Sequence, residues 1–173
     1  VGGRRHHGST HVLDLGRVKL SHSLRKTMRR KIFQVTFDRV FDDVIAACAE
    51  APREGQSGTW ITPEMQEAYI KLYGLGYAHS VESWCDGMLV GGLYGVSLGK
   101  AFFGESMFHH KTDASKVALA VLVHKLQAWG FHFIDSQMTT DHMHRLGAEE
   151  IPRRIFLKKL HSALRHATRR GKW

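Results

Sequence analysis

The segment Asp135-Ser136-Gln137 has residue types and a spacing that could do chemistry. Residues 131–137 are predicted to form a strand, along which residues i and i+2 point to the same face. The Asp135 carboxylate could then accept from the Gln137 amide and leave the amide oxygen as an acceptor for a substrate N–H. Such a pair can orient and polarise an attacking amine. The same spacing also fits a polar pair that only satisfies nearby backbone groups, and spacing alone leaves this alternative open.

Glu105 follows Phe102-Phe103-Gly104 at the end of a strand predicted over residues 100–105. A carboxylate next to aromatic residues and a glycine could recognise a basic group or tune a proton. An exposed acid that only ends a strand is the alternative, and it also stays open.

Several chemistries are excluded because their motifs are missing. The sequence has no GxSxG elbow, Walker loop, GxGxxG or CxxC. Its thirteen histidines lack HExxH spacing and suitably placed acid or cysteine partners, so we expect no metal. Residues 106–113 contain no glycine-rich turn, and Asp113 puts a negative charge where a pyrophosphate would bind a helix N-terminus. CoA is therefore excluded as donor, and no cofactor is expected.

The elements that must position these residues follow from hydrophobic periodicity and turn signals. Asp86-Gly87 between two strand-like runs predicts a tight hairpin. Gly91, Gly92 and Gly95 within the second run indicate a bulge or a close approach to the backbone. Strands are expected over residues 32–37, 78–84, 88–96, 100–105 and 131–137, and helices over 23–30, 114–129 and 140–146, with one beginning after Asp38 as N-cap, one at Thr62-Pro63 and one at Pro152.

A meander followed by a buried helix and another strand is the pattern of an N-acetyltransferase-like α/β (α+β) fold. We therefore expect a mixed, mostly antiparallel sheet flanked by helices. This expectation concerns the fold and carries no function by itself.

Charge is distributed unevenly along the chain, whose net charge is +9. Residues 1–31 hold nine basic residues and one acidic residue, residues 151–173 hold eight basic residues and no acidic one, and the middle is net acidic. Basic ends are typical of a polyanion-binding rim, with nucleic acid as the leading candidate, although two solvated charge runs are the plain alternative. The predicted parts are a basic N-terminal segment (1–31), a catalytic domain (32–157) and a basic C-terminal tail (158–173).

Residues 1–16 show no periodicity, so we expect them to be poorly ordered, and they lack the apolar core of a secretory signal. No stretch approaches the roughly 18 apolar residues of a membrane span. Cys48 and Cys85 are expected to be buried free thiols in a reducing cytoplasm.

At this point the sequence resembles one family, the leucyl/phenylalanyl-tRNA–protein transferases, from about residue 17 to about residue 157. Long ungapped motifs in the right order make the resemblance specific. They are Ser21-His22-Ser23-Leu24-Arg25-Lys26, residues 51–63, residues 76–82, residues 91–96, residues 102–108, residues 112–116 and residues 129–137.

The resemblance implies transfer of Leu or Phe, and less well Met, from aminoacyl-tRNA to a protein whose N-terminal residue is Arg or Lys. The new N-terminus would mark that protein for degradation. The catalytic residues would be Gln137, which draws the amine proton, Asp135, which polarises Gln137, and Glu105, which helps to hold the basic acceptor side chain.

The resemblance also implies two binding regions. Trp60 and Phe102 would line an apolar pocket for the Leu or Phe side chain and the terminal adenosine. The other substrate-binding residues would be Phe103, Gly104, Ser106, Leu119 and Thr139. The tRNA acceptor stem would be bound through its phosphates by Arg25, Lys26, Arg29, Arg30 and Lys31.

One departure from the family keeps other functions open. Family members usually carry a Trp-Trp-Ser-Pro segment near the donor pocket, whereas an unrelated-looking stretch precedes the shared part here. The alternatives are a non-catalytic tRNA-binding or RNA-binding relic of the fold and an N-acyltransferase with a different donor. In each case we expect a cytoplasmic monomer without membrane contact.

Overall fold

The computed structural model describes residues 9–51, 60–136 and 141–173. The strands of this part are β1 (Ser9–Asp14), β2 (Gln34–Phe37), β3 (Ala78–Cys85), β4 (Met88–Leu98), β5 (Ala101–His109), β6 (Phe133–Ser136) and β7 (Glu149–Pro152). Its helices are α1 (His22–Arg29), α2 (Phe41–Glu50), α3 (Pro63–Gly74), α4 (Ala114–Ala128), α5 (Asp141–Leu146) and α6 (Arg153–Leu164).

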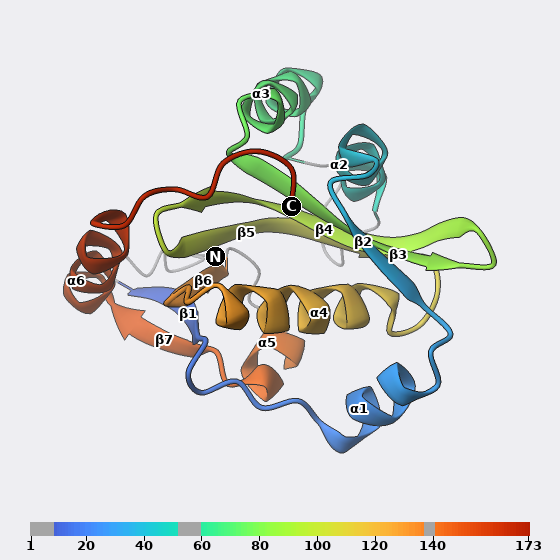
Figure 1. Cartoon of the computed structure of the whole chain (residues 1–173), viewed down its shortest axis with the longest axis horizontal. Coiled ribbons are helices and arrows are strands. Elements are labelled where there is room, and N and C mark those ends of the chain that lie inside the picture. Colours follow the sequence, from blue (N-terminus) through green and yellow to red (C-terminus); the bar gives the residue numbers. More distant parts are fainter. Residues whose placement is uncertain (1–8, 52–59, 137–140) are drawn as a thin grey trace, which may run out of the picture.

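The described strands form one sheet in the order β2-β3-β4-β5-β6-β1-β7. Neighbouring strands are antiparallel except β5 and β6, which run parallel. Helices α1, α4 and α5 lie on one side of the sheet, α2 and α3 lie on the other, and α6 lies at the end formed by β1 and β7 (Figure 1). The predicted mixed, mostly antiparallel sheet with flanking helices is confirmed, and the meander β3–β5 followed by α4 and β6 is the N-acetyltransferase-like arrangement.

The hairpin between β3 and β4 forms at the predicted dipeptide. Asp86 and Gly87 have φ angles of 51° and 77°, and two successive positive φ angles are what a two-residue hairpin of the primed type requires. Farther along β4, a Cβ on Gly91 would lie 2.6 Å from the Cβ of Ala114. The glycine thus allows α4 to pack directly on the backbone of β4, as the predicted close approach requires.

Helix α4 is the centre of the larger hydrophobic core. Leu119, Leu122 and Leu126 are at most 3% exposed and pack with Leu93 and Phe102 of the sheet. The predicted helix of residues 114–129 is confirmed. Because apolar residues cover more than half of its surface, it can be buried by the sheet on one side and by α1 and α5 on the other.

Strand β1 contradicts the expectation that residues 1–16 are poorly ordered, as far as the described residues reach. It lies inside the sheet, antiparallel to both β6 and β7, and its Leu13 is fully buried. The sequence did not predict β7 either. Both strands are short, with polar residues among the apolar ones, and their pairing partners are distant in the sequence, so local patterning carries little signal for them.

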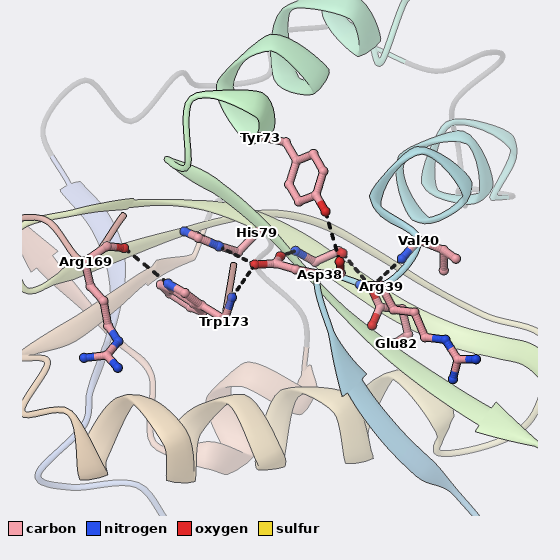
Figure 2. Close-up of polar contacts among 9 residues, drawn as sticks. Asp38, Arg39, Val40, Tyr73, His79, Glu82, Arg169 and Trp173 are labelled. Atoms are coloured by element: carbon pink, nitrogen blue, oxygen red, sulfur yellow. Dashed lines mark hydrogen bonds and ion pairs between the residues drawn. The ribbon is translucent and has the colours of Figure 1, made fainter. Parts of the chain in front are cut away.

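Asp38 was predicted to be the N-cap of α2, and this is wrong. The N-cap position belongs to Val40, and the Asp38 side chain is turned into the interior (Figure 2). There its carboxylate accepts from Nδ1 of His79 at 2.8 Å, the backbone N–H of Ser80 at 2.9 Å and the backbone N–H of Trp173 at 2.8 Å.

Glu82, rather than Asp38, binds backbone N–H groups at the start of α2. Its carboxylate accepts from the backbone N–H groups of Arg39 and Val40 at 3.2 Å and 3.4 Å (Figure 2). A residue of β3 therefore binds the N-cap residue of α2 and the residue before it, more than 40 positions earlier in the chain.

The segment after α6 returns across the molecule and ends at Asp38 (Figures 1 and 2). The Arg170 guanidinium donates to the carbonyl of Leu75, and the ring of Trp173 stacks on that of His79 with 3.7 Å between centroids. Helix α6 also continues past residue 157 to Leu164. The division into domains stays a prediction, but this end of the chain is tied to the same sheet as the rest.

Candidate active site

Asp135 lies on β6, which pairs in parallel with β5 and antiparallel with β1. Its side chain is buried, with only 4% of the residue exposed. Its Oδ1 accepts from the hydroxyl of Thr10, on β1, at 3.2 Å. Burial raises the pKa of Asp135, while the Thr10 hydrogen bond and the nearby His11 oppose that rise. A buried carboxyl group with a shifted pKa, bound by a donor from a distant part of the sequence, is a functional-site candidate.

Glu105 lies at a β-bulge in the pairing of β4 with β5. Tyr94 pairs with Ser106 and Gly95 pairs with Gly104, so Glu105 has no residue opposite it. A bulge redirects the side chain of its extra residue, and bulges are frequent next to active sites. The bulge predicted from the β4 glycines is confirmed, and Glu105 is its extra residue on β5.

Glu105 faces α3 across a cavity of about 400 Å³. The Tyr69 hydroxyl, from α3, is hydrogen-bonded to the Glu105 carboxyl group. Burial raises the pKa of Glu105, the charge of Asp135 adds to the rise, and the Tyr69 hydrogen bond opposes it. Apart from these two residues the cavity wall is apolar, being formed by Met65, Ala68, Leu72, Val96, Leu98 and Phe103.

The two carboxyl groups belong to one face of the sheet. Phe103 on β5 pairs with Asp135 on β6, and paired residues of neighbouring strands point to the same side. Phe103 also lines the cavity next to Glu105. The fold thus joins two of the three predicted catalytic residues on one surface, and the third, Gln137, lies outside the described residues together with Thr139.

Comparison with known proteins decides the family. The model of the leucyl/phenylalanyl-tRNA protein transferase family matches residues 12–161. This chain belongs to that family. It is 55% identical over 162 residues to the leucyl/phenylalanyl-tRNA–protein transferase of Myxococcus xanthus and 57% identical over 162 residues to that of Aromatoleum aromaticum. The matches cover 94% of this chain and 69% and 68% of the two relatives.

Solved structures support the fold of this transferase. A conserved protein of unknown function from Staphylococcus epidermidis superposes with a TM-score of 0.55 at 10% identity, covering 84% of this chain and 58% of that one. The C-terminal domain of a putative lysylphosphatidylglycerol synthetase from Agrobacterium fabrum gives 0.53 at 11% identity, with the same coverage. At these identities the likeness shows the fold alone. The resemblance drawn from the motifs and the prediction of a transferase are confirmed by the family.

The predicted substrate-binding residues of this transferase lie on both faces of the sheet. Phe102 and Leu119 are buried in the core beneath α4, while Phe103 lines the cavity near Glu105. Trp60 is 41% exposed, just before α3. The other two within the described residues are Gly104, which pairs with Gly95 and with Ser136, and Ser106, which is buried opposite Tyr94. Their roles stay predictions.

The predicted tRNA-binding residues lie on and just after α1. Leu24 and Met28 pack that helix against Val117 and Ala120 of α4, and the Thr27 hydroxyl donates to Asp113 at 3.1 Å. The opposite surface of α1 faces solvent and carries charged side chains. Its basic residues, all exposed, are Arg25, Lys26, Arg29, Arg30 and Lys31.

The start of α4 does not offer the anion site of an acyl-CoA enzyme. Asp113 precedes the helix, and its carboxylate is bound by Lys116 Nζ at 3.1 Å and by the Thr27 hydroxyl. A fixed negative charge at this position opposes a pyrophosphate. Within residues 9–51, 60–136 and 141–173, no group of three or more His, Cys, Asp or Glu side chains could hold a metal ion.

Two further observations concern the whole described chain. Cys48 and Cys85 are both buried and free, as predicted. None of the helices in the described ranges is long and apolar enough to cross a membrane.

Sequence reasoning missed Thr10 and Tyr69, which contact the two carboxyl groups. Thr10 lies in the segment expected to be poorly ordered, so no local signal indicates it. Tyr69 lies in the helix predicted to begin at Thr62-Pro63. Its periodic position is the one signal that could have identified it, because the hydroxyl of a tyrosine on a buried helix face needs a partner.

Proposed function

We propose that this chain transfers Leu or Phe, and less well Met, from aminoacyl-tRNA to the α-amino group of proteins that begin with Arg or Lys. The added residue would mark those proteins for degradation. Membership of the family supports the reaction, and the relatives are named for it. The observation that carries the assignment to this site is that buried Asp135 and bulged Glu105 share one face beside an apolar cavity.

The reaction needs little more than correct placement of the amine. The neutral α-amino nitrogen attacks the ester carbonyl carbon, a C–N bond forms, the ester C–O bond breaks, and the terminal ribose hydroxyl of the tRNA leaves with a proton. An α-amino group titrates near pH 8, so a useful neutral fraction exists at pH 7. Because the ester is already activated, holding the reactants in the reactive geometry supplies a large part of the rate.

Gln137 and Asp135 would act on the attacking amine. The Gln137 amide oxygen would draw the amine proton, and the Asp135 carboxylate would hold and polarise the Gln137 amide. The buried position of Asp135 supports this role, because a carboxylate interacts more strongly with a neighbouring amide where water is excluded.

Glu105 would bind the basic side chain of the acceptor. The cavity beside it has apolar walls that fit the methylene stem of Arg or Lys, and Glu105 is the one acid among the described residues of that wall. A cation in the cavity would favour the ionised form of Glu105 and offset the effect of its burial.

The donor would be bound by apolar residues and by α1. Trp60 and Phe102 would contact the Leu or Phe side chain and the terminal adenosine, and an apolar pocket of this kind discriminates size only modestly. The further substrate contacts would come from Phe103, Gly104, Ser106, Leu119 and Thr139. The five basic residues of residues 25–31 would bind tRNA phosphates without reading sequence. We place the reaction in the cytoplasm, where aminoacyl-tRNA is found, with the enzyme acting as a monomer and without a cofactor.

Incubation with labelled Leu-tRNA and Phe-tRNA tests the proposal. One peptide begins with Arg, its matched control begins with Ala, and Gln137→Ala is assayed in parallel. Label should move to the Arg peptide alone and should be lost in the variant. If no label moves while tRNA still binds in a salt-dependent manner, the chain is a binding core and the catalytic proposal is wrong.

A further inference from the structure

A second, smaller cavity lies where α1, α4 and α5 meet, on the other side of the sheet from Glu105. It has a volume of about 190 Å³. Figure 1 shows these three helices together on that side. The residues around it are Ser21, Ser23, Leu24, Asp113, Lys116, His142, Arg145 and Leu146. Hydroxyl, ammonium, guanidinium and imidazole groups thus converge on one small space, while the catalytic residues proposed above are elsewhere.

The charge around this cavity favours an anion. Lys116 and Arg145 contribute two positive charges, and Asp113 contributes one negative charge. Asp113 opposes a pyrophosphate at the start of α4, but its two carboxylate oxygens are bound by Lys116 and Thr27. The wall therefore keeps the positive charge of Arg145 for a singly charged phosphodiester. Lys116 has three N–H donors and Arg145 has five, so donors remain after that ion pair is formed.

His142 adds a buried group without a partner. Its Nε2 atom has no hydrogen-bond partner among the described residues, and an unpaired buried polar atom is costly. Burial, and then the charge of Lys116, lower the pKa of His142 to about 4, with Arg145 acting in the same direction and Asp113 opposing. The ring is therefore neutral at pH 7, and a neutral ring with its proton on Nε2 can donate to an anion.

The position of the cavity connects it to the surface proposed to bind tRNA. Its wall includes Ser21, the N-cap of α1, whose exposed residues carry the basic surface. Helix α5, which carries His142 and Arg145, supplies the other side of the wall.

We propose that this cavity binds one phosphate group of an RNA backbone that lies along α1. The inference rests on the proposed function, which supplies the RNA as the tRNA donor. RNA is favoured over free phosphate because the basic surface of α1 continues from the cavity wall and can hold the neighbouring phosphates.

The first experiment observes His142 directly by NMR in the full chain with labelled histidine. His142→Gln identifies the resonance. The probes are inorganic phosphate, the tetranucleotide ACCA, and the same tetranucleotide with uncharged methylphosphonate linkages. We expect phosphate and ACCA to shift the resonance and to raise the pKa of His142, because a nearby anion favours the charged ring. The methylphosphonate form should do neither.

The second experiment measures tRNA affinity against salt concentration for Arg145→Gln. Loss of one charge-assisted contact should weaken binding about tenfold and reduce the salt slope by about one. Arg165→Gln is the matched control, since Arg165 is also exposed and carries the same charge. It follows α6, which lies at the opposite end of the molecule from α1 in Figure 1. An equal loss in both variants would show a general charge effect and overturn the proposal.

The outcomes separate this inference from the proposed function. If the chain transfers amino acid but ACCA leaves His142 unchanged, the cavity proposal is wrong and the transferase stands. If inorganic phosphate alone shifts His142, the cavity is a free-phosphate site and the RNA assignment is wrong. If ACCA shifts His142 and Arg145→Gln removes the shift, the cavity proposal holds whether or not transfer is detected.

Discussion

The Thr10 hydroxyl lies 3.2 Å from Oδ1 of Asp135, across 125 positions of the sequence. The two residues meet because β1 is inserted between β6 and β7. This donor favours the charged form of Asp135 and opposes the effect of burial on its pKa. The order of the sheet therefore supplies Asp135 with a hydrogen-bond donor that favours its charged form.

Replacing Thr10 by Val removes this donor and keeps the shape of the side chain. The pKa of Asp135 should rise further, so the acid limb of the kcat profile should move to higher pH. At neutral pH we expect kcat to fall about fivefold, the equivalent of one hydrogen bond worth about 1 kcal/mol, with little change in peptide KM. Steady-state kinetics across pH measures both effects.

Thr168→Val is the matched control for that change. The Thr168 hydroxyl oxygen accepts from the backbone N–H of Gly99 at 2.9 Å, in the C-terminal segment. Its loss should cost a similar amount of stability and leave kcat unchanged. If both valine variants lower kcat equally, the effect of Thr10 is structural and the assigned role is wrong.

Tyr69→Phe tests the protonation of Glu105. The Tyr69 hydrogen bond lowers the pKa of Glu105, whereas burial and the charge of Asp135 raise it, so the variant should have a Glu105 pKa that is higher still. Binding of a basic acceptor needs the ionised carboxylate. The value of kcat/KM for the Arg peptide should therefore begin to fall at a higher pH as the solution is acidified.

Tyr73→Phe controls for the loss of a tyrosine hydroxyl from the same helix. Tyr73 donates to the backbone oxygen of Asp38 at 2.9 Å, outside the cavity. The acid limb of the kcat/KM profile of Tyr73→Phe should match that of the unmodified protein. A Tyr69→Phe profile displaced to lower pH would rule out the proposed coupling.

Gly95→Ala should disturb the bulge that contains Glu105. A Cβ at this position would clash with the backbone oxygen of Phe103 and with the ring of Phe102. We expect a loss of about 2 kcal/mol in the free energy of unfolding and a lower kcat/KM for the Arg peptide. Gly74→Ala is the control, because nothing lies within 4 Å of a Cβ there and helix propensity should stabilise it slightly. Urea unfolding and kinetics on both proteins decide the matter.

Trp173→Ala should release the C-terminal segment from the sheet. Its ring packs on His79, Phe102, Trp129 and Phe131, so the free energy of unfolding should fall by about 3 kcal/mol. Trp173→Phe keeps an aromatic ring and should lose less than half of that. Urea midpoints at constant m measure both, and an unchanged midpoint for the alanine variant would refute the anchoring role.

The sequence by itself determined the features that depend on neighbouring residues. Asp86-Gly87 specifies a turn with two positive φ angles, and the apolar pattern of residues 114–129 specifies a buried helix, because both signals lie within a few positions. The motifs around Glu105 and Asp135 likewise identified the family. The β4 glycines indicated a bulge without indicating which side chain it would redirect.

Only the tertiary structure decided the partners of the charged groups. Asp38 looked like a helix cap, yet it is held by His79 and Trp173, and Glu82 binds the backbone N–H groups just before α2. Thr10 reaches Asp135 only after β1 pairs with β6. Such contacts join residues far apart in the chain, and they form because a buried carboxylate must find donors wherever the packed fold brings them. Local sequence patterns therefore do not predict which distant residues will meet.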